Sequence, residues 1–321
     1  MQSCTVFYVN NLYKILRTNG SGCWVNSHYF GILGYSDDSF LLAPSLDSLQ
    51  EMLKICETYA IMHNLKFSTD ANPDKCKTKC IAFLHRERPV KQVKLCGDLL
   101  PWVTHGKHLG NTIENKINGM KLDIRQKRAK YIAKNNELLQ EFHFAHPKTK
   151  IEVNRIFNNH FTGSPLWDLF NKETDMLCNS WNKSVRLMFD VPITTHRYFL
   201  EPLSGLKYLK FTLFTRFLNF IAQIEKSPKI LPNILLQASR RDCRSITGSN
   251  LRNILLLTKK DDISMLVNSD IDQLVYMPVP NNEKWRIDML HELVEVKWGD
   301  GEITNFEEYE IDNIIADICT T

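Results

Sequence analysis

The sequence predicts an α+β fold, in which an antiparallel β region with one packed helix precedes a remainder that is all α. Over the first 113 residues, short apolar runs alternate with turn signals, as in chains built from short strands. From about residue 117 the apolar positions recur at helical spacing. The 321 residues are 43% hydrophobic and 24% charged, which is typical of globular chains. We expect three parts, at residues 1–113, 114–205 and 206–321.

The first strands and the only helix expected in this β region come from one stretch. The runs Tyr29–Tyr35 and Ser39–Ala43 flank a polar turn, which indicates two paired strands. Pro44 ends the second strand, and Ser45 is a good N-cap with Asp47 in the first turn. Apolar residues then recur at helical spacing, which predicts a helix with one buried face, running to about residue 64. Its buried positions are expected at Leu46, Leu49, Leu53, Cys56 and Ala60.

Turn signals such as Gly97-Asp98 and His105-Gly106 divide the next apolar runs into short segments. Each segment has the length of a strand. The strands expected here are Leu65–Thr69, Lys79–Leu84, Val93–Cys96, Leu99–Val103 and Lys107–Gly110.

The rest of the chain is expected to be helical. Pro147 suits the first turn of a helix, and Pro192 marks a break. Shorter helices follow, one with an N-cap at Gly248–Asn250 and a last one near 306–318, after a turn at Trp298–Gly301. The long helices are expected at roughly 117–142, 147–160, 171–189 and 206–226.

Composition argues against a membrane or secreted protein. The most apolar helix, Phe211–Ile224, is interrupted by Arg216 and Asn219 and is too short to span a bilayer. The stretch Met1–Val9 has no positive charge before its apolar run, unlike a secretory signal. The nine cysteines are an odd number with no disulfide-like spacing. We therefore expect an intracellular protein with reduced thiols; the sequence does not indicate its oligomeric state.

Charge is unevenly distributed along the chain. The net charge is +8 over residues 1–150, +5 over 151–250 and −9 over 251–321. A basic front with an acidic tail suggests a polyanionic partner for the front. The alternative is a solvated surface whose charge happens to be uneven.

The adjacent carboxylates of Asp37 and Asp38 are the sharpest candidate for chemistry. Two neighbouring carboxylates at a turn repel each other unless a cation lies between them, and Mg²⁺ prefers such oxygen ligands. Paired magnesium ions can activate a hydroxyl and stabilise a leaving pyrophosphate. The alternative is an ordinary β-turn, in which aspartate is common for its turn propensity.

The surrounding motifs resemble the palm of reverse transcriptases, most closely those of LINE-like, non-LTR retrotransposons. The likeness covers about residues 24–113 and rests on three motifs in the order found in that family. They are the (Phe/Tyr)-x-Asp-Asp hairpin at Tyr35–Asp38, the Asn72-Pro73 to Lys77-Thr78-Lys79 segment, and the primer-grip hairpin from Gly97 to Lys107-His108-Leu109-Gly110. The resemblance implies a partial polymerase palm followed by a helical thumb.

Residue roles follow from the resemblance alone. Asp37 would ligate the metal directly, with Asp38 as its supporting neighbour, and Mg²⁺ would be the cofactor. Tyr35 would stand beside the primer terminus. Lys77 would help to protonate the leaving pyrophosphate, although Lys75 is a rival because two extra residues follow the Asn-Pro pair.

Two further groups of residues would contact nucleic acid. Lys107, His108, Leu109 and Gly110 would hold the primer backbone, as the family's primer grip does. In the helix expected at 117–142, Lys121, Arg125 and Arg128 share one face, and Lys127, Lys130 and Lys134 share another. Such a helix would contact phosphates without sequence preference. A solvated lysine-rich face is the alternative.

The implied reaction is addition of deoxynucleotides to a DNA primer on an RNA template. In the family, an upstream strand supplies another metal-binding aspartate, yet Met1–Asn19 contains no acidic residue. We therefore expect the C-terminal part of a retrotransposon polymerase, inactive alone. Two alternatives are a catalytically silent nucleic-acid-binding remnant and a non-functional fossil that folds poorly.

A zinc site is a weaker candidate. Cys76, Cys80 and His85 have suitable chemistry, but no second ligand pair follows at a finger-like spacing. Two cysteines four residues apart on a strand share a face, which favours burial in the core. His105 and His108 fall within the primer-grip likeness and need no metal.

Overall fold

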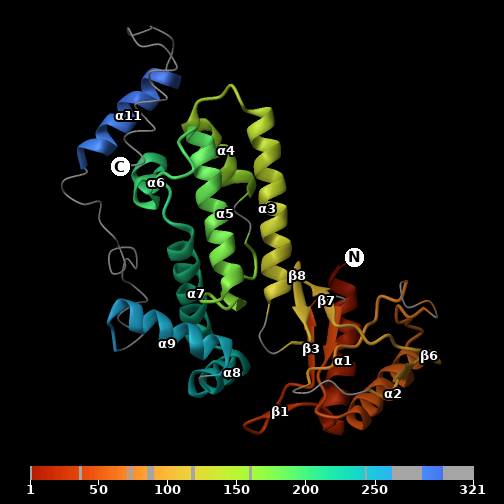
Figure 1. Ribbon diagram of the computed structural model, residues 1–321. Coiled ribbons are helices and arrows are strands. Elements are labelled where there is room, and N and C mark those ends of the chain that lie inside the picture. Colours follow the sequence, from red (N-terminus) through yellow and green to blue (C-terminus); the bar gives the residue numbers. More distant parts are fainter. Residues whose placement is uncertain are drawn as a thin grey trace. The chain divides into compact units, whose positions relative to one another are not determined.

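A computed structural model describes residues 2–35, 38–70, 72, 75–84, 90–116, 120–158, 161–242, 244–261 and 284–298 (Figure 1). Contacts divide the chain into two compact units. The first comprises residues 1–108, 112–117 and 227–238, and the second 109–111, 118–226 and 239–321. The described part is mainly helical with small two-stranded hairpins, in agreement with the expected α+β class. The division at 113 and 205 stays a prediction.

Two long helices pack together in the first unit: α1 (Gln2–Asn19) and α2 (Leu46–Met62). The predicted cap of α2 is confirmed, because the Ser45 side chain accepts a hydrogen bond from the Ser48 backbone N–H. Helix α1 buries Leu12 and Leu16, which lie one turn apart on the same face. The expectation of a single helix in this region is therefore wrong.

The strands of the first unit are short and pair as neighbours along the chain. Each pair forms its own two-stranded sheet. Their bounds are β1 (Trp24–Val25) with β2 (His28–Tyr29), β3 (Ile32–Tyr35) with β4 (Asp38–Leu41), β5 (Lys94–Leu95) with β6 (Asp98–Leu99), and β7 (His105–His108) with β8 (Asn111–Glu114).

Three of these hairpins turn through left-handed backbone. Asn26 and Ser27 have φ of 47° and 62°, Cys96 and Gly97 have φ of 53° and 85°, and Leu109 and Gly110 have φ of 46° and 77°. Consecutive left-handed residues give the turn a twist that matches the strands it joins. The strand expected at Lys107–Gly110 therefore ends at His108, and its last two residues form the turn.

The strands expected at Leu65–Thr69 and Lys79–Leu84 are not formed as ladders. Both stretches are held by isolated bonds: the Thr78 N–H donates to the Ser68 carbonyl oxygen, and Cys80 forms a single parallel bridge with Trp102. The bridge cannot extend backwards, because Pro101 has no N–H to donate to a further rung.

A single apolar core joins these pieces. Ile32 and Leu41, from β3 and β4, are partly buried against it, so the hairpin rests on the same core as the two helices. The buried members are Leu12, Leu16, Met52, Leu53, Cys56, Tyr59, Cys76, Cys80, Val93, Leu95 and Leu100.

The second unit is built around helix α5 (Lys172–Phe189), which packs against four other helices. Helices α3 (Lys121–Glu141) and α4 (Pro147–Asn158) run beside it (Figure 1). Helices α6 (Arg197–Ser204) and α7 (Leu209–Lys226) also contact it. The predicted helix starting at Pro147 is confirmed, and the helix expected at 171–189 corresponds to α5.

The remaining elements are η1 (Ser164–Leu166), α8 (Ile230–Arg241), α9 (Ile246–Thr258) and α11 (Lys284–Trp298). The N-cap expected at Gly248–Asn250 is wrong, because α9 begins earlier, with Ser245 as its cap. Asn250 is instead fully buried: its Oδ1 accepts from the Leu169 N–H, and its Nδ2 donates to the Trp167 carbonyl. The turn expected after Trp298 and the helix near 306–318 lie outside the described residues.

Among the described helices, none is long and apolar enough to cross a membrane.

Candidate nucleic-acid interface

The predicted polar hairpin is present as β3 and β4. Its register runs from Ile32 opposite Leu41 to Tyr35 opposite Asp38, so only two residues separate the last pair. The Tyr35 side chain is 62% exposed, and Asp38 is exposed beside it. Ser36 and Asp37 lie outside the described residues, so of the predicted metal ligands only Asp38 is placed.

Helix α1 supports this hairpin. The Tyr13 and Ser39 hydroxyl groups lie 2.9 Å apart and form a hydrogen bond. A Cβ added at Gly34 would lie 1.9 Å from the Tyr13 hydroxyl oxygen, so the absence of a side chain lets the tyrosine cross the strand. The hairpin is therefore held on one side by a helix that sequence patterns did not predict.

The structure brings the predicted primer-grip strand to the same hairpin. The rings of Phe40, on β4, and His108, on β7, meet edge to face with centroids 4.2 Å apart. Lys107 is exposed next to His108, and Leu109 is 47% exposed in the turn that follows. Two motifs far apart in sequence are thus neighbours within the first unit.

Lys77 and its rival Lys75 are both exposed. Lys75 donates its backbone N–H to the Asn72 carbonyl, and Lys77 lies in the extended stretch between the buried residues Cys76 and Cys80. In the described part of the chain, no hydrogen bond or ion pair joins either lysine to Asp38. These contacts do not favour Lys77 over Lys75 for the predicted role beside the pyrophosphate.

Cys76 and Cys80, the cysteines of the zinc candidate, are buried core residues. Burial raises the pKa of Cys80 to about 11, which keeps it a neutral thiol near neutral pH. The Cys76 Sγ lies 3.0 Å from the Thr78 carbonyl oxygen and donates to it. Among the described residues, no group of three His, Cys, Asp or Glu side chains could hold a metal ion. His85, the third zinc candidate, lies outside them.

The predicted phosphate-contacting residues of α3 face an acidic residue of α5. An Arg125 guanidinium nitrogen lies 2.6 Å from a Glu173 carboxylate oxygen, and the Arg128 Nε donates to the Ser180 hydroxyl over 2.8 Å. The hydrogen bond from Arg125, and then the charges of Arg125, Arg128 and Lys121, lower the pKa of Glu173. These three basic residues therefore surround one carboxylate of the same unit, although the Arg125 side chain stays 61% exposed.

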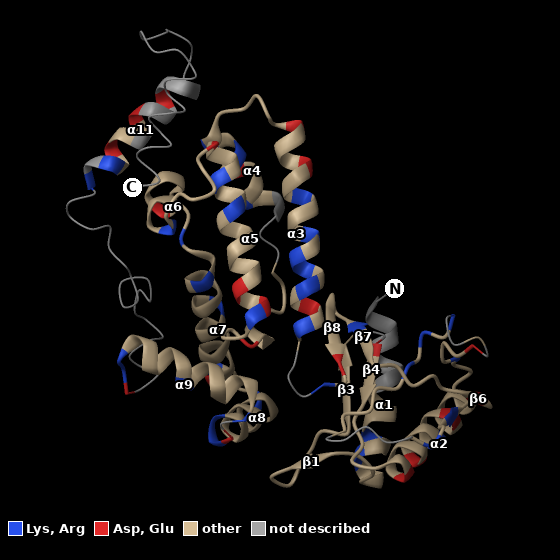
Figure 2. Cartoon of the chain, in the orientation of Figure 1, with Lys and Arg blue, Asp and Glu red and all other residues tan. Residues whose placement is uncertain are grey.

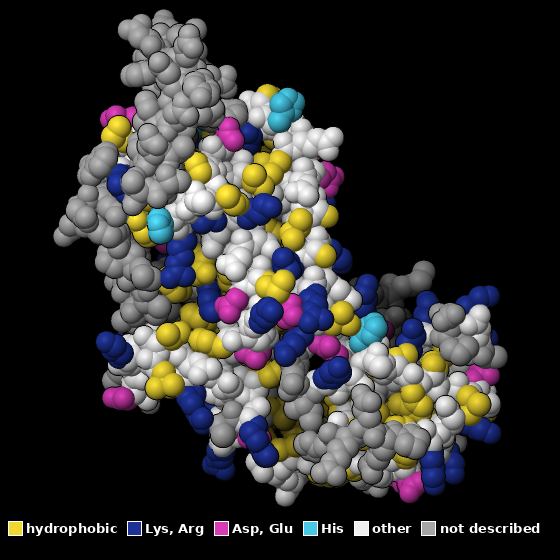
Figure 3. All heavy atoms as spheres, viewed as in Figure 1, with side chains coloured by type: hydrophobic (Ala, Val, Ile, Leu, Met, Phe, Trp, Pro, Cys, Tyr) yellow, Lys and Arg dark blue, Asp and Glu magenta, His cyan; other side chains and the backbone are white. Residues whose placement is uncertain are grey.

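The three lysines of the second predicted face of α3, Lys127, Lys130 and Lys134, differ in exposure. The Lys127 side chain is only 12% exposed; its ammonium lies 3.0 Å from the Asp123 carboxylate and donates to Asn111 and Thr162. Lys130 and Lys134 are exposed. Figure 2 shows this basic stretch along the helix, with acidic residues at its C-terminal end. Figure 3 shows basic and acidic side chains intermixed over the same helix.

The donor set of the hairpin suits Mg²⁺ in kind. Two adjacent carboxylates provide oxygen ligands, and protein sites for Mg²⁺ commonly use one or two carboxylates and complete the shell with phosphates and water. No aspartate or glutamate precedes Asp37 in this chain.

Comparison with known protein families and with curated proteins finds no match to this chain.

Proposed function

We propose that this chain is the C-terminal part of a reverse transcriptase of the LINE-like, non-LTR class, an RNA-directed DNA polymerase. It would comprise the catalytic-hairpin half of the palm, the primer grip and a helical thumb. One observation carries the proposal: the Tyr35–Asp38 hairpin and the Lys107–Gly110 hairpin adjoin through the contact between Phe40 and His108. Two motifs that the resemblance requires at one site are neighbours, with α2 between them in sequence.

In this proposal the hairpin residues serve the reacting ends of the nucleic acids. Asp37 and Asp38 would hold Mg²⁺, which supplies electrostatic stabilisation of the phosphoryl transfer when bound. Tyr35, largely exposed beside Asp38, would contact the primer terminus. Lys77 would donate a proton to the leaving pyrophosphate, and residues 107–110 would hold the primer backbone.

The chain alone should not polymerise. Two-metal transfer needs every ligand fixed, and a misplacement of about 1 Å costs on the order of a hundredfold in rate. The residues before Asp37 contain no carboxylate, and the described ones among them form α1, the small β1–β2 hairpin and strand β3. The second candidate function, a catalytically silent nucleic-acid-binding protein, is favoured by this lack.

Either function requires sequence-independent binding of an RNA–DNA duplex. Lys130 and Lys134 are exposed, and Arg125 keeps most of its side chain in solvent while it contacts Glu173. An arginine has five N–H donors, so it can keep one carboxylate bond and still reach a phosphate. We expect three or four phosphate contacts, which corresponds to a log–log salt slope of about −3 to −4.

The test is primer extension on an RNA template with purified chain and Mg²⁺, beside a binding titration on the same duplex. We expect binding that weakens with salt and no extension. Extension that disappears in Asp37→Ala would refute the proposed inactivity and support the polymerase. Binding that is insensitive to salt would contradict both functions. Asp47→Ala, which removes an aspartate of α2, is the control for net charge.

A further inference from the structure

The second unit contains a cavity of about 530 Å³ that the proposed function does not use. It lies between α5, α6 and α7, with the connection between α6 and α7 and one residue of α9 completing the wall. Its volume is within the range of roughly 300–1,000 Å³ that small-molecule sites occupy. Every residue that lines it belongs to the described part of the second unit.

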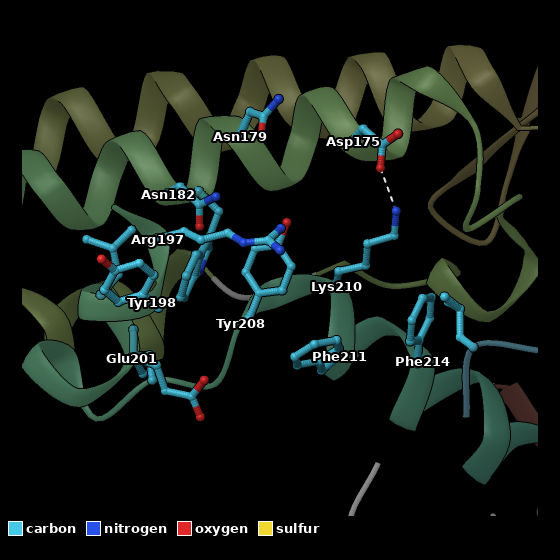
Figure 4. A pocket seen from close by; sticks show the side chains of 14 residues that line it. Asp175, Asn179, Asn182, Arg197, Tyr198, Glu201, Tyr208, Lys210, Phe211 and Phe214 are labelled. Carbon is cyan, nitrogen blue, oxygen red and sulfur yellow. Dashed lines mark hydrogen bonds and ion pairs between the residues drawn. The ribbon is translucent and has the colours of Figure 1, made fainter. Parts of the chain in front are cut away.

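One wall of the cavity combines a guanidinium with a tyrosine ring. The Arg197 guanidinium carbon lies 5.6 Å from the centroid of the Tyr208 ring, and the Phe211 ring supports the same tyrosine edge to face at 5.4 Å. Figure 4 shows the guanidinium of Arg197 over the tyrosine. Planar guanidinium and aromatic groups together make a platform on which another flat group can stack.

A buried acceptor lies beside this stack. Asn182 is 6% exposed; its side chain bonds the Tyr208 hydroxyl, and its Oδ1 has no hydrogen-bond partner among the described residues. Figure 4 shows its amide on the side of Arg197, whereas the amide of Asn179, one turn earlier on α5, is directed away. A buried polar atom without a partner is costly, so this position favours a ligand that brings an N–H donor.

The charges of the lining are balanced. The Lys210 ammonium lies 2.6 Å from the Asp175 carboxylate and is thereby neutralised within the cavity (Figure 4). The lining also holds Arg197 and Glu201, so its formal charges sum to zero, although the Glu201 carboxylate is directed away from the guanidinium (Figure 4). The cavity therefore suits a flat group that is itself neutral.

We infer that this cavity binds a nucleobase, stacked against Arg197 and Tyr208 and donating an N–H to the Oδ1 of Asn182. A nucleobase is planar and neutral and carries N–H donors at its edge, so it meets all three demands of the lining. Stacking on aromatic and guanidinium planes is also how proteins hold unpaired bases. The site needs neither Asp37 nor Asp38, so it goes beyond the proposed function and does not depend on it.

The base can come from a free nucleoside or from a single strand. Equilibrium dialysis with labelled adenosine, guanosine, cytidine and uridine, beside ribose, tests the first source. Fluorescence anisotropy with a single-stranded oligoribonucleotide, beside a strand of equal length without bases, tests the second. The full chain is used throughout, and circular dichroism confirms that each variant is folded.

Asn182→Leu removes the acceptor with little change in volume and should weaken binding about tenfold to a hundredfold. Asn179→Leu is the matched control on the same helix and should change binding less than about threefold. If Asn182→Leu fails to fold, Arg197→Met replaces it. Arg197 is exposed, so its substitution should leave the fold intact. Loss of stacking on the guanidinium should weaken binding of the base about tenfold or more.

Nucleoside binding that Asn182→Leu weakens, with no binding of ribose, supports the site and identifies a free ligand. Weakening confined to the strand that carries bases supports the site with the strand as source. Three results overturn the inference: no binding of any base, equal binding by wild type and both variants, or equal loss in Asn179→Leu and Asn182→Leu.

Discussion

Replacing Glu173 with glutamine tests whether this carboxylate holds the basic residues of α3 and so competes with a phosphate for them. The change leaves the side-chain size almost unchanged and removes the negative charge that Arg125, Arg128 and Lys121 surround. Because the Arg125 side chain is 61% exposed, solvent screens the pair, and we expect a loss of about 1 kcal/mol in the free energy of unfolding. For a cooperative unit of about 150–250 residues, the size range of the second unit, that corresponds to a fall of about 2–4 °C in its Tm.

The pH dependence of this loss has a defined sign. The pKa of Glu173 is lowered from its ordinary value of 4.5, first by the hydrogen bond from Arg125 and then by the surrounding positive charges. A carboxylate with a lowered folded-state pKa stabilises the protein above its unfolded-state pKa, and the contribution is lost as the pH falls through the folded-state pKa. The difference between wild type and Glu173→Gln should therefore be present at pH 7 and disappear at strongly acidic pH.

The same change should tighten nucleic-acid binding. Removing one negative charge about 4–10 Å from a phosphate lowers the repulsion by about 0.4–1 kcal/mol in water, or about twofold to fivefold in affinity. If Arg125 then gains a phosphate contact, the log–log salt slope steepens by about 0.9. Fluorescence anisotropy of a labelled RNA–DNA duplex over a salt series measures both quantities.

Glu141→Gln is the matched control, because it makes the same chemical change at an exposed position of α3. It lies sixteen residues from Arg125, about 24 Å along the helix, and two turns beyond Lys134. Equal effects of the two substitutions would mean that only net charge matters. Unchanged or weaker binding by Glu173→Gln would refute the reasoning that Glu173 competes with phosphate.

Three further changes test the packing around both units. Gly34→Ala should cost about 1–3 kcal/mol, because its Cβ would lie 1.9 Å from the Tyr13 hydroxyl; urea unfolding should show no such cost when Tyr13→Ala is also present. Asn250→Ala should cost about 2–4 kcal/mol by leaving two buried backbone groups unpaired, whereas Asn253→Ala on the same helix should cost under about 0.5 kcal/mol in the same assay. Removing residues 282–321, which carry most of the acidic tail, should tighten duplex binding most at low salt, and equal tightening at all salt concentrations would contradict this.

Local signals account for what the sequence predicted well. The N-cap Ser45, the acidic residue that follows it and the apolar spacing lie within a few turns of chain, so α2 could be placed without knowledge of the rest. The same holds for the hairpin of β3 and β4, where two apolar runs meet at a polar pair. The start of α4 at Pro147 is also a local signal, because the fixed φ of proline suits the first turn of a helix.

Features that depend on distant partners were missed. Among the side chains of α1 whose burial is described, at residues 10–19, only Leu12 and Leu16 are buried, and the helix packs on α2. The ladder expected around Cys80 is cut short by Pro101, which lies on a different run of sequence. Asn250 looked like a cap because asparagine often is one, whereas its bonds go to a loop far earlier in the chain.

The basic helix shows why counting charges overestimates a nucleic-acid surface. A helical projection correctly groups Lys121, Arg125 and Arg128 on one face, but it carries no information on what that face meets. The carboxylate that meets it, Glu173, lies on another helix, where it reads simply as a favourable acidic residue in a first turn. A phosphate must therefore compete with an intramolecular partner for Arg125, and it meets no such competition at Lys130 and Lys134, which are exposed without a described ion pair. Any duplex that binds this helix should consequently contact the Lys130 and Lys134 side first, and the arginines only where its phosphates outweigh Glu173.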